Sequence, residues 1–126
     1  MTSPAPTFVF VYGTLKRHGA NHRFLTGQKF LGAARTAPGY RLFDLGDYPG
    51  MVARPDDRDG VAGEVWSVDA ACLARLDKLE GLAAGLYRRA PVPLLPPFAD
   101  YSVETYFYAR SVEGRPIVRD GLWPAR

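Results

Sequence analysis

The chain has 126 residues, of which 47% are hydrophobic, and its formal net charge at neutral pH is +3. A chain of this length buries one substantial hydrophobic core but not two, so we expect a single domain over residues 1–126, with its core at about 7–112 and a C-terminal tail at 113–126. The charges are scattered along the chain, which argues against the long basic surface of a nucleic-acid-binding protein, and we expect no nucleic-acid partner.

Cysteine usage and the apolar segments narrow the class of protein further. Cys72 is the only cysteine, so no internal disulfide and no thiolate metal cluster can form. Residues 1–6 lack the basic start and apolar run of a secretory signal, and no segment reaches the roughly 20 apolar residues that span a bilayer. We therefore expect a cytoplasmic protein with no membrane partner.

Prolines and glycines divide the chain into short segments, which is typical of a sheet-rich fold with tight connections. Residues 7–12 predict a central strand, because this apolar run leaves neither face polar. Asn21 is placed to cap a short helical turn that reaches Leu25 and ends at Gly27. Further strands are predicted at residues 29–35, 40–45, 51–53 and 61–68.

The spacing of the apolar residues then changes from the period of a strand to that of a helix. Asp69 is a suitable N-cap, residues 70–80 carry one apolar stripe, and Gly81 stands where a helix would end. Two more strands are predicted after the helix, at residues 87–95 and 101–110. Many strands with one late helix predict an α+β fold whose sheet curls into a barrel or near-barrel.

Glu80 is the most informative polar residue of the predicted helix. At about 100° per residue it follows Cys72 and Leu76 in the i, i+4 column, so its carboxyl group faces the side of the apolar stripe. It also lies in the last turn, where the helix dipole disfavours a negative charge. Burial and dipole would both raise the pKa of this carboxyl group, as proton transfer near neutral pH requires.

The helix pattern leaves an alternative open. If the helix ends at Leu79, Glu80 is free to swing into solvent or to pair with Arg88 or Arg89, and the periodicity does not choose between these outcomes. Asp77 lies farther round the helix and is expected to be solvated.

Glu64 is the second candidate acid. It shares a strand face with Trp66, so its side chain is also expected to point inward. A glutamate on a partly buried strand more often anchors hydrogen bonds than performs catalysis. Gly63 beside it would admit a close approach of backbone.

Cations and two histidines follow the first predicted strand. His18 and His22 have a spacing that binds metal on a helix, but a glycine lies between them and no third ligand is in view. We interpret both as surface histidines and predict no metal site. Lys16 and Arg17 are interpreted as solvated charges that are able to attract an anionic substrate.

Several motifs occur in the order found in one known superfamily. They are "VYGTLKRHGANHRFL" (11–25), "YPGMV" (48–52), "GVAGEVWSVD" (60–69), "LDKLEG" (76–81), "YRR" (87–89) and "YFYAR" (106–110). On these motifs the chain resembles the gamma-glutamylcyclotransferase-like superfamily. The opening "YGTLKR" followed by "NHRFL" is most similar to the gamma-glutamylamine cyclotransferase branch.

The resemblance implies a single-domain α+β fold, a small mixed β-barrel flanked by helices, with a cavity at one end. It implies that the backbone of Tyr12, Gly13, Thr14 and Leu15 holds the glutamyl part of a small-molecule substrate and that Glu80 is the general acid and base. The reaction would be attack of the α-amine of a gamma-glutamyl amine or gamma-glutamyl amino acid on its own γ-carbonyl. This releases 5-oxoproline and the free amine, and no cofactor is expected.

Further expectations concern the rest of the site. Gly13 would permit a tight turn whose successive N–H groups converge on an anion. Of Tyr106 and Tyr108, one would line the cavity while the other faces outward, with core packing the more common role for either. The candidates for lining the cavity are Tyr48, Pro49, Glu64, Tyr87 and Tyr108. The alternative function is a non-catalytic small-molecule or protein-binding module on the same scaffold, as a monomer or weak homodimer.

Overall fold

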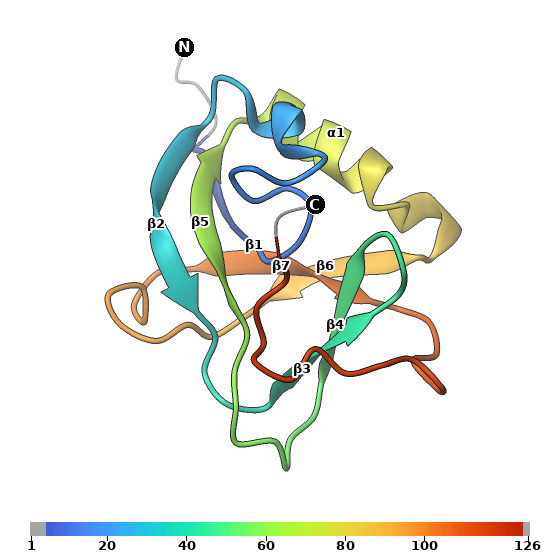
Figure 1. Cartoon of the computed structure of the whole chain (residues 1–126). Coiled ribbons are helices and arrows are strands. Elements are labelled where there is room, and N and C mark those ends of the chain that lie inside the picture. The colour runs from blue at the N-terminus through green and yellow to red at the C-terminus, as the bar shows by residue number, and fades with distance from the viewer. Residues whose placement is uncertain (1–4, 125–126) are drawn as a thin grey trace.

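A twisted, mixed β-sheet and one α-helix form the fold of this computed structural model, which describes residues 5–124 (Figure 1). Both helical turns outside α1 are 3-10 turns, labelled η1 and η2. The elements in chain order are β1 (Thr7–Val11), η1 (His22–Leu25), β2 (Lys29–Arg35), β3 (Tyr40–Asp44), β4 (Pro49–Ala53), β5 (Ala62–Val68), α1 (Ala70–Leu79), η2 (Leu82–Ala84), β6 (Tyr87–Pro91) and β7 (Val103–Tyr108). The α+β class is therefore confirmed.

The sheet divides at β7 and does not close. Its strand order is β2-β5-β1-β7-β4-β3, and β6 lies antiparallel along the other edge of β7. β1 pairs in parallel with Val103–Thr105 of β7, whereas β4 pairs in parallel with Phe107 farther along the same strand. Because β1 and β4 share one edge of β7, the two halves of the sheet diverge there. Within residues 5–124, β2 and β3 form no ladder with each other, so of the expected barrel or near-barrel the sheet is not a closed barrel.

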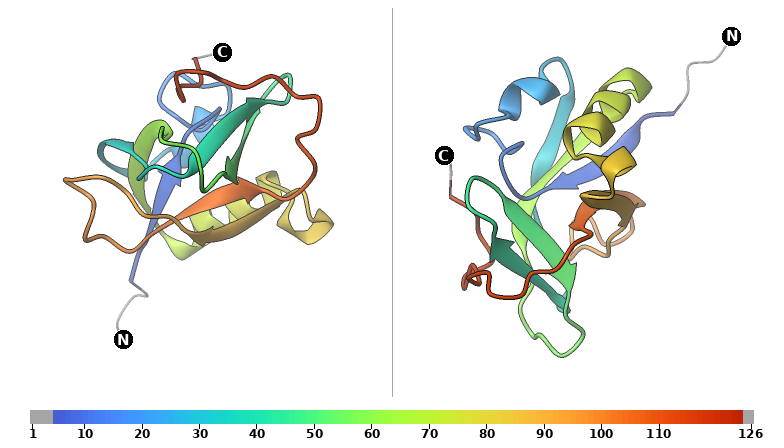
Figure 2. Two further views of the ribbon diagram at one scale, coloured as in Figure 1. Left: turned by 90° about the horizontal axis from the view of Figure 1, so that it is seen from below. Right: turned by 90° about the vertical axis from the view of Figure 1, so that its right-hand side faces the viewer.

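β1 is a central strand that is buried on both faces, as its apolar run predicted. Val9 and Val11 pack beneath α1, which lies across this face of the sheet (Figure 2). Phe10 and Tyr12 point to the opposite face and enter a second core, inside the curve of the sheet. The end of β1 is therefore fixed between two packed cores, which holds the loop that follows it.

α1 begins where its sequence predicts and ends one residue before the predicted limit. The Asp69 side chain accepts a hydrogen bond of 2.7 Å from the Cys72 N–H, and Gly81 has a left-handed backbone with φ of 65°. The last helical residue is Leu79, and Glu80 is the C-cap residue. No helix in the described part of the chain is long and apolar enough to cross a membrane.

The C-terminal segment packs against the body of the protein. Trp123 is 1% exposed and belongs to the core inside the curved sheet. Its carbonyl oxygen accepts a hydrogen bond of 2.6 Å from the Lys16 Nζ. Lys16 is buried, and burial lowers the pKa of its ammonium group, so the interpretation of Lys16 as a solvated charge is wrong. The Lys16 side chain therefore connects the loop after β1 to Trp123, near the end of the described residues.

Candidate active site

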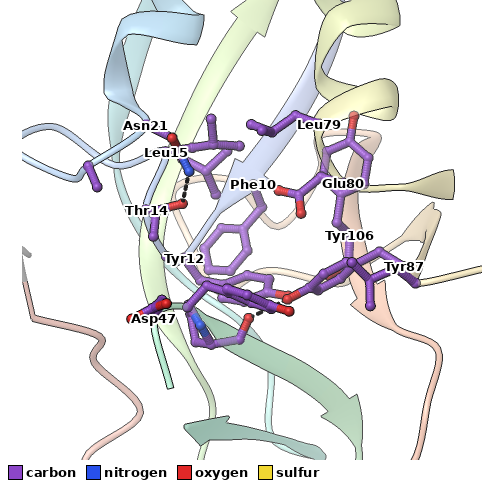
Figure 3. Close-up of a pocket in the computed structure, with 16 residues that line it drawn as sticks. Phe10, Tyr12, Thr14, Leu15, Asn21, Asp47, Leu79, Glu80, Tyr87 and Tyr106 are labelled. Carbon is purple, nitrogen blue, oxygen red and sulfur yellow. Dashed lines mark hydrogen bonds between the residues drawn. The ribbon is translucent and has the colours of Figure 1, made fainter. Parts of the chain in front are cut away.

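A cavity of about 340 Å³ lies where β1 ends (Figure 3). Its walls come from the loop after β1, the turn between β3 and β4, the end of α1, and the tyrosines of β6 and β7. The lining residues are Phe10, Val11, Tyr12, Gly13, Thr14, Leu15, Ala20, Asn21, Asp47, Tyr48, Pro49, Leu79, Glu80, Leu86, Tyr87 and Tyr106. A pocket of this volume is at the small end of the range for small-molecule sites, about 300–1,000 Å³.

Glu80 points into this cavity even though α1 ends one residue earlier (Figure 3). The alternative partners for its carboxyl group are engaged elsewhere. Arg89 pairs with Asp77 at 2.9 Å and with Glu104 at 2.7 Å, while the Arg88 guanidinium stacks over Phe107. The alternative in which Glu80 swings out to pair with an arginine is therefore not what the structure shows.

The Glu80 carboxyl group has an environment that favours its neutral form. Among residues 5–124, no hydrogen bond or ion pair engages this side chain. Burial raises its pKa from the ordinary value of 4.5 to about 7. Near neutral pH the group is then present in both protonation states, which suits it to accept a proton and to donate one.

The loop after β1 brings unpaired backbone donors to the cavity. Gly13, Thr14 and Leu15 line it in succession, and none of their N–H groups donates to an acceptor among the described residues. The loop is held from behind, since the Asn21 side chain donates a bond of 3.0 Å to the Thr14 hydroxyl and the Asn21 N–H donates one of 2.9 Å to the Thr14 carbonyl. Such fixed main-chain donors suit a carboxylate or a developing oxyanion.

The tyrosine hydroxyl groups at the cavity hold the fold around it. Tyr12 donates to the Tyr106 carbonyl at 2.5 Å and accepts from the Met51 N–H at 3.1 Å, which ties β7 to β4 where the sheet divides. Tyr87 donates to the Pro49 carbonyl at 2.7 Å. Burial raises the pKa of Tyr12 and Tyr87 far above the usual value, so these hydroxyl groups remain neutral. They shape the cavity and are not available as anionic groups in it.

Comparison with known proteins places the chain in a family. A family model described as gamma-glutamyl cyclotransferase, AIG2-like, matches residues 9–125. The chain belongs to this family. The superfamily resemblance found in the sequence motifs is thereby confirmed.

Individual proteins of known sequence or structure support the same placement. A Vibrio cholerae relative is 38% identical over 118 residues, which cover 94% of this chain and 96% of that protein. The solution structure of the Escherichia coli gamma-glutamylcyclotransferase family protein YtfP is 34% identical with a TM-score of 0.68, covering 93% of this chain and 96% of that one. The crystal structure of a mouse AIG2-like protein is 27% identical with a TM-score of 0.70, covering 86% of this chain and 79% of that one.

In this gamma-glutamyl cyclotransferase family member, two expected cavity residues lie elsewhere. Glu64 is a structural anchor, whose carboxylate accepts hydrogen bonds from the Arg17 N–H at 3.0 Å, the Arg17 Nε at 3.1 Å and the Trp66 Nε1 at 3.1 Å. Tyr108 packs edge-on against the Tyr87 ring, with ring centroids 5.3 Å apart. Neither lines the cavity, so both expectations are wrong. Tyr48, Pro49 and Tyr87 do line it, as expected.

Tyr106 takes the place that was expected of Tyr108. Side chains two residues apart on a strand share a face, so both tyrosines point to the α1 side of β7, contrary to the expectation that one faces outward. Tyr106 lies nearer the cavity and donates a hydrogen bond of 2.7 Å to Asp77. Asp77, which also pairs with Arg89, is therefore not the free solvated charge that its place on the helix indicated.

Other lining residues carried weak or misleading sequence signals. Asn21 was interpreted as a helix cap, but it makes no side-chain capping bond and instead holds Thr14. Asp47 lies in a short turn and carries no motif signal of its own.

The two histidines after β1 do not line the cavity. His22 contacts the Leu15 carbonyl oxygen through Nδ1 at 3.1 Å. Among residues 5–124 no group of histidine, cysteine and acidic side chains is arranged to hold a metal ion.

Gly13 is required for a different reason from the expected one. Its φ is not in the left-handed region, but a Cβ at this position would lie 2.7 Å from the Pro49 Cγ. The glycine therefore allows the β3–β4 turn to close against the loop after β1. This contact brings together two walls of the cavity that are distant in the sequence.

Replacing Gly13 by alanine is expected to lower the free energy of unfolding by about 1–3 kcal/mol, the usual cost of overpacking a closely packed site. Urea denaturation of the purified variant measures the change. The double variant Gly13→Ala, Pro49→Ala removes the ring that the new Cβ would meet, so its loss should be smaller than the sum of the two single losses. Additive losses would show that the contact with Pro49 does not explain the glycine.

Proposed function

We propose that this chain is a gamma-glutamyl cyclotransferase that releases 5-oxoproline from a gamma-glutamyl amine or gamma-glutamyl amino acid. The observation that carries the proposal is the unpaired Glu80 carboxyl group, with a pKa of about 7, in a cavity that is also lined by Gly13–Leu15, whose N–H groups have no acceptor among the described residues. Family membership supports the same class of reaction.

The reaction is an intramolecular aminolysis. The Glu80 carboxylate accepts a proton from the substrate α-ammonium group, and the neutral amine then attacks the γ-carbonyl carbon of the same molecule. A new C–N bond closes the five-membered ring. The protonated Glu80 then donates its proton to the departing nitrogen as the original C–N bond breaks, and the regenerated carboxylate passes the second proton of the ring nitrogen to the released amine. The products are 5-oxoproline and the free amine in its ammonium form, and Glu80 returns to its starting carboxylate state.

The chain's contribution is to fold the substrate and move protons. Well-oriented intramolecular reactions reach effective molarities on the order of 10⁵–10⁸ M, so a cavity that holds the glutamyl chain in a bent form supplies much of the acceleration. The N–H groups of Gly13, Thr14 and Leu15 would hold the α-carboxylate, with the Thr14 hydroxyl as a further donor. The attack and these proton transfers need no cofactor.

The size of the cavity limits the size of the leaving group. At about 340 Å³ it admits a gamma-glutamyl unit with a modest amine or amino acid, which is compatible with the gamma-glutamylamine cyclotransferase branch that the opening motif resembles.

A substrate panel tests the proposal. We expect 5-oxoproline when the purified protein is incubated with gamma-glutamyl amines and gamma-glutamyl amino acids, measured by chromatography against enzyme-free blanks. A panel that includes a gamma-glutamyl dipeptide, a gamma-glutamyl-ε-lysine link and simple alkyl amides covers the main leaving groups. Binding of these compounds without 5-oxoproline would instead support the non-catalytic binding module.

A further inference from the structure

The cavity is acidic although the protein as a whole carries a net charge of +3. Among its lining residues, the only carboxylic acids are Asp47 and Glu80, and no lysine, arginine or histidine is present. A gamma-glutamyl unit brings one carboxylate and one ammonium group, which the loop N–H groups and Glu80 would receive under the proposed function. The second carboxyl group, that of Asp47, is then left without an assigned partner.

Asp47 lies at the far side of the cavity from Glu80 (Figure 3). It is exposed, in the turn between β3 and β4 that a Leu45 N–H to Tyr48 carbonyl bond of 3.0 Å closes. No ion pair or hydrogen bond among residues 5–124 engages its side chain. An acid at the mouth without a cation of the protein beside it is available to a charged ligand.

Aromatic rings flank the same part of the cavity. Tyr48 follows Asp47 in the chain and is 38% exposed, and its ring centroid lies 6.4 Å from that of Tyr87. Tyrosine ring faces attract ammonium groups through their negative π-electron density, and the attraction adds to that of a nearby carboxylate. A carboxylate beside aromatic faces is the chemistry that recognises an organic cation.

We propose that Asp47 and the Tyr48 ring form a leaving-group subsite that selects gamma-glutamyl derivatives of amines bearing a second, positively charged group. This inference rests on the proposed function, because it assumes that the glutamyl part occupies the end of the cavity nearest Glu80. The site thus distinguishes substrates by the charge on the departing amine. Gamma-glutamyl compounds with neutral or anionic leaving groups bind more weakly.

Two ligands of matched length test the subsite. One is the gamma-glutamyl amide of 1,4-diaminobutane, which ends in an ammonium group, and the other is that of pentylamine, which ends in a methyl group. Their dissociation constants are measured by calorimetry with Glu80→Gln protein, so that neither ligand is consumed. We expect about tenfold tighter binding of the cationic ligand, the combined effect of one exposed ion pair and one cation–π contact, and a smaller ratio at 1 M salt.

Variants assign the preference to its residues. Asp47→Asn is expected to bring the two dissociation constants together, whereas Asp56→Asn makes the same change in net charge in an exposed loop outside the cavity and should keep the tenfold ratio. Tyr48→Leu should reduce the ratio without removing it. Equal affinities in the Glu80→Gln protein, or a ratio that survives Asp47→Asn, would overturn the inference.

Turnover of the same two amides by the unmodified protein separates this inference from the proposed function. If 5-oxoproline forms but the cationic and the uncharged ligand bind equally well, the subsite is contradicted and the cyclotransferase proposal is retained. The opposite result is also informative. If Asp47→Asn abolishes a preference for the cationic ligand but the protein forms no 5-oxoproline from any gamma-glutamyl compound, the subsite is supported and the proposed reaction is contradicted.

Discussion

Glu80→Gln is expected to lower kcat for 5-oxoproline formation by about 10²–10⁴-fold, the usual contribution of a positioned proton-transfer group. The amide has the size of the acid but neither accepts the ammonium proton nor donates one to the leaving nitrogen. Because the Glu80 side chain makes no hydrogen bond or ion pair in the described part of the chain, its replacement removes no structural contact. The folded variant should therefore bind substrate and fail to convert it. Initial rates and circular dichroism of both proteins measure this.

The matched control is the other inward-facing glutamate. Glu64→Gln removes a charge that pairs with Arg17, so it is expected to lower stability while the folded protein keeps kcat within a few-fold of the unmodified enzyme. The pH profile is a second readout, since kcat/KM should rise as the pH passes through about 7, where Glu80 ionises. Wild-type kcat in a well-folded Glu80→Gln protein would remove Glu80 from the mechanism.

Local sequence patterns were sufficient for the elements that build the site. The doubly apolar run of residues 7–12 predicted the central strand, and Asp69 and Gly81 predicted the limits of α1. Helical periodicity allowed an inward Glu80 without choosing it over an outward one, and the structure shows the inward direction at the C-cap position. Each of these features depends on interactions between residues close in the chain, which spacing alone can express.

The features that were missed depend on contacts between residues distant in the chain. β1 and β4 pair with the same edge of β7. This pairing joins segments far apart in the chain, so no single run of residues predicts it. Lys16 is buried because its ammonium group finds the carbonyl of Trp123, which is 107 positions away. Gly13 is glycine because Pro49 closes on it from another hairpin. Asp47 reaches the cavity because the β3–β4 turn packs against the loop after β1. The sequence around Asp47 therefore gave no sign of its position.

These long-range contacts also explain how a small protein makes a cavity. Where β1 and β4 part along β7, the two halves of the sheet leave a gap that the Tyr12 hydroxyl bridges through Met51 and Tyr106. The loop after β1 closes one side of this gap and the end of α1 closes another. The divided sheet is therefore the feature that brings Glu80 and the loop after β1 to one cavity.

The raised pKa of Glu80 predicts how stability depends on pH. In the unfolded chain the carboxyl group ionises near its ordinary pKa of 4.5, whereas in the folded chain it keeps its proton until about pH 7. Between these values the folded state binds more protons than the unfolded state, so this group makes the free energy of unfolding fall as the pH rises. The loss is complete above about pH 7 and amounts to up to about 3 kcal/mol.

Glu80→Gln should remove this term, so the variant is expected to match the unmodified protein near pH 4.5 and to be more stable by up to about 3 kcal/mol at pH 8. Urea denaturation midpoints of both proteins across this range measure the difference, in which contributions from all other ionisable groups cancel. Glu113→Gln makes the same substitution at an exposed turn and controls for the change in net charge. Curves for Glu80→Gln and the unmodified protein that stay parallel from pH 4.5 to pH 8 would contradict a buried, proton-holding Glu80. As expected here, Glu80→Gln raises stability and lowers activity together. Both effects have one cause, because the burial that raises the pKa of the carboxyl group to near neutral pH also destabilises the folded state when the group ionises.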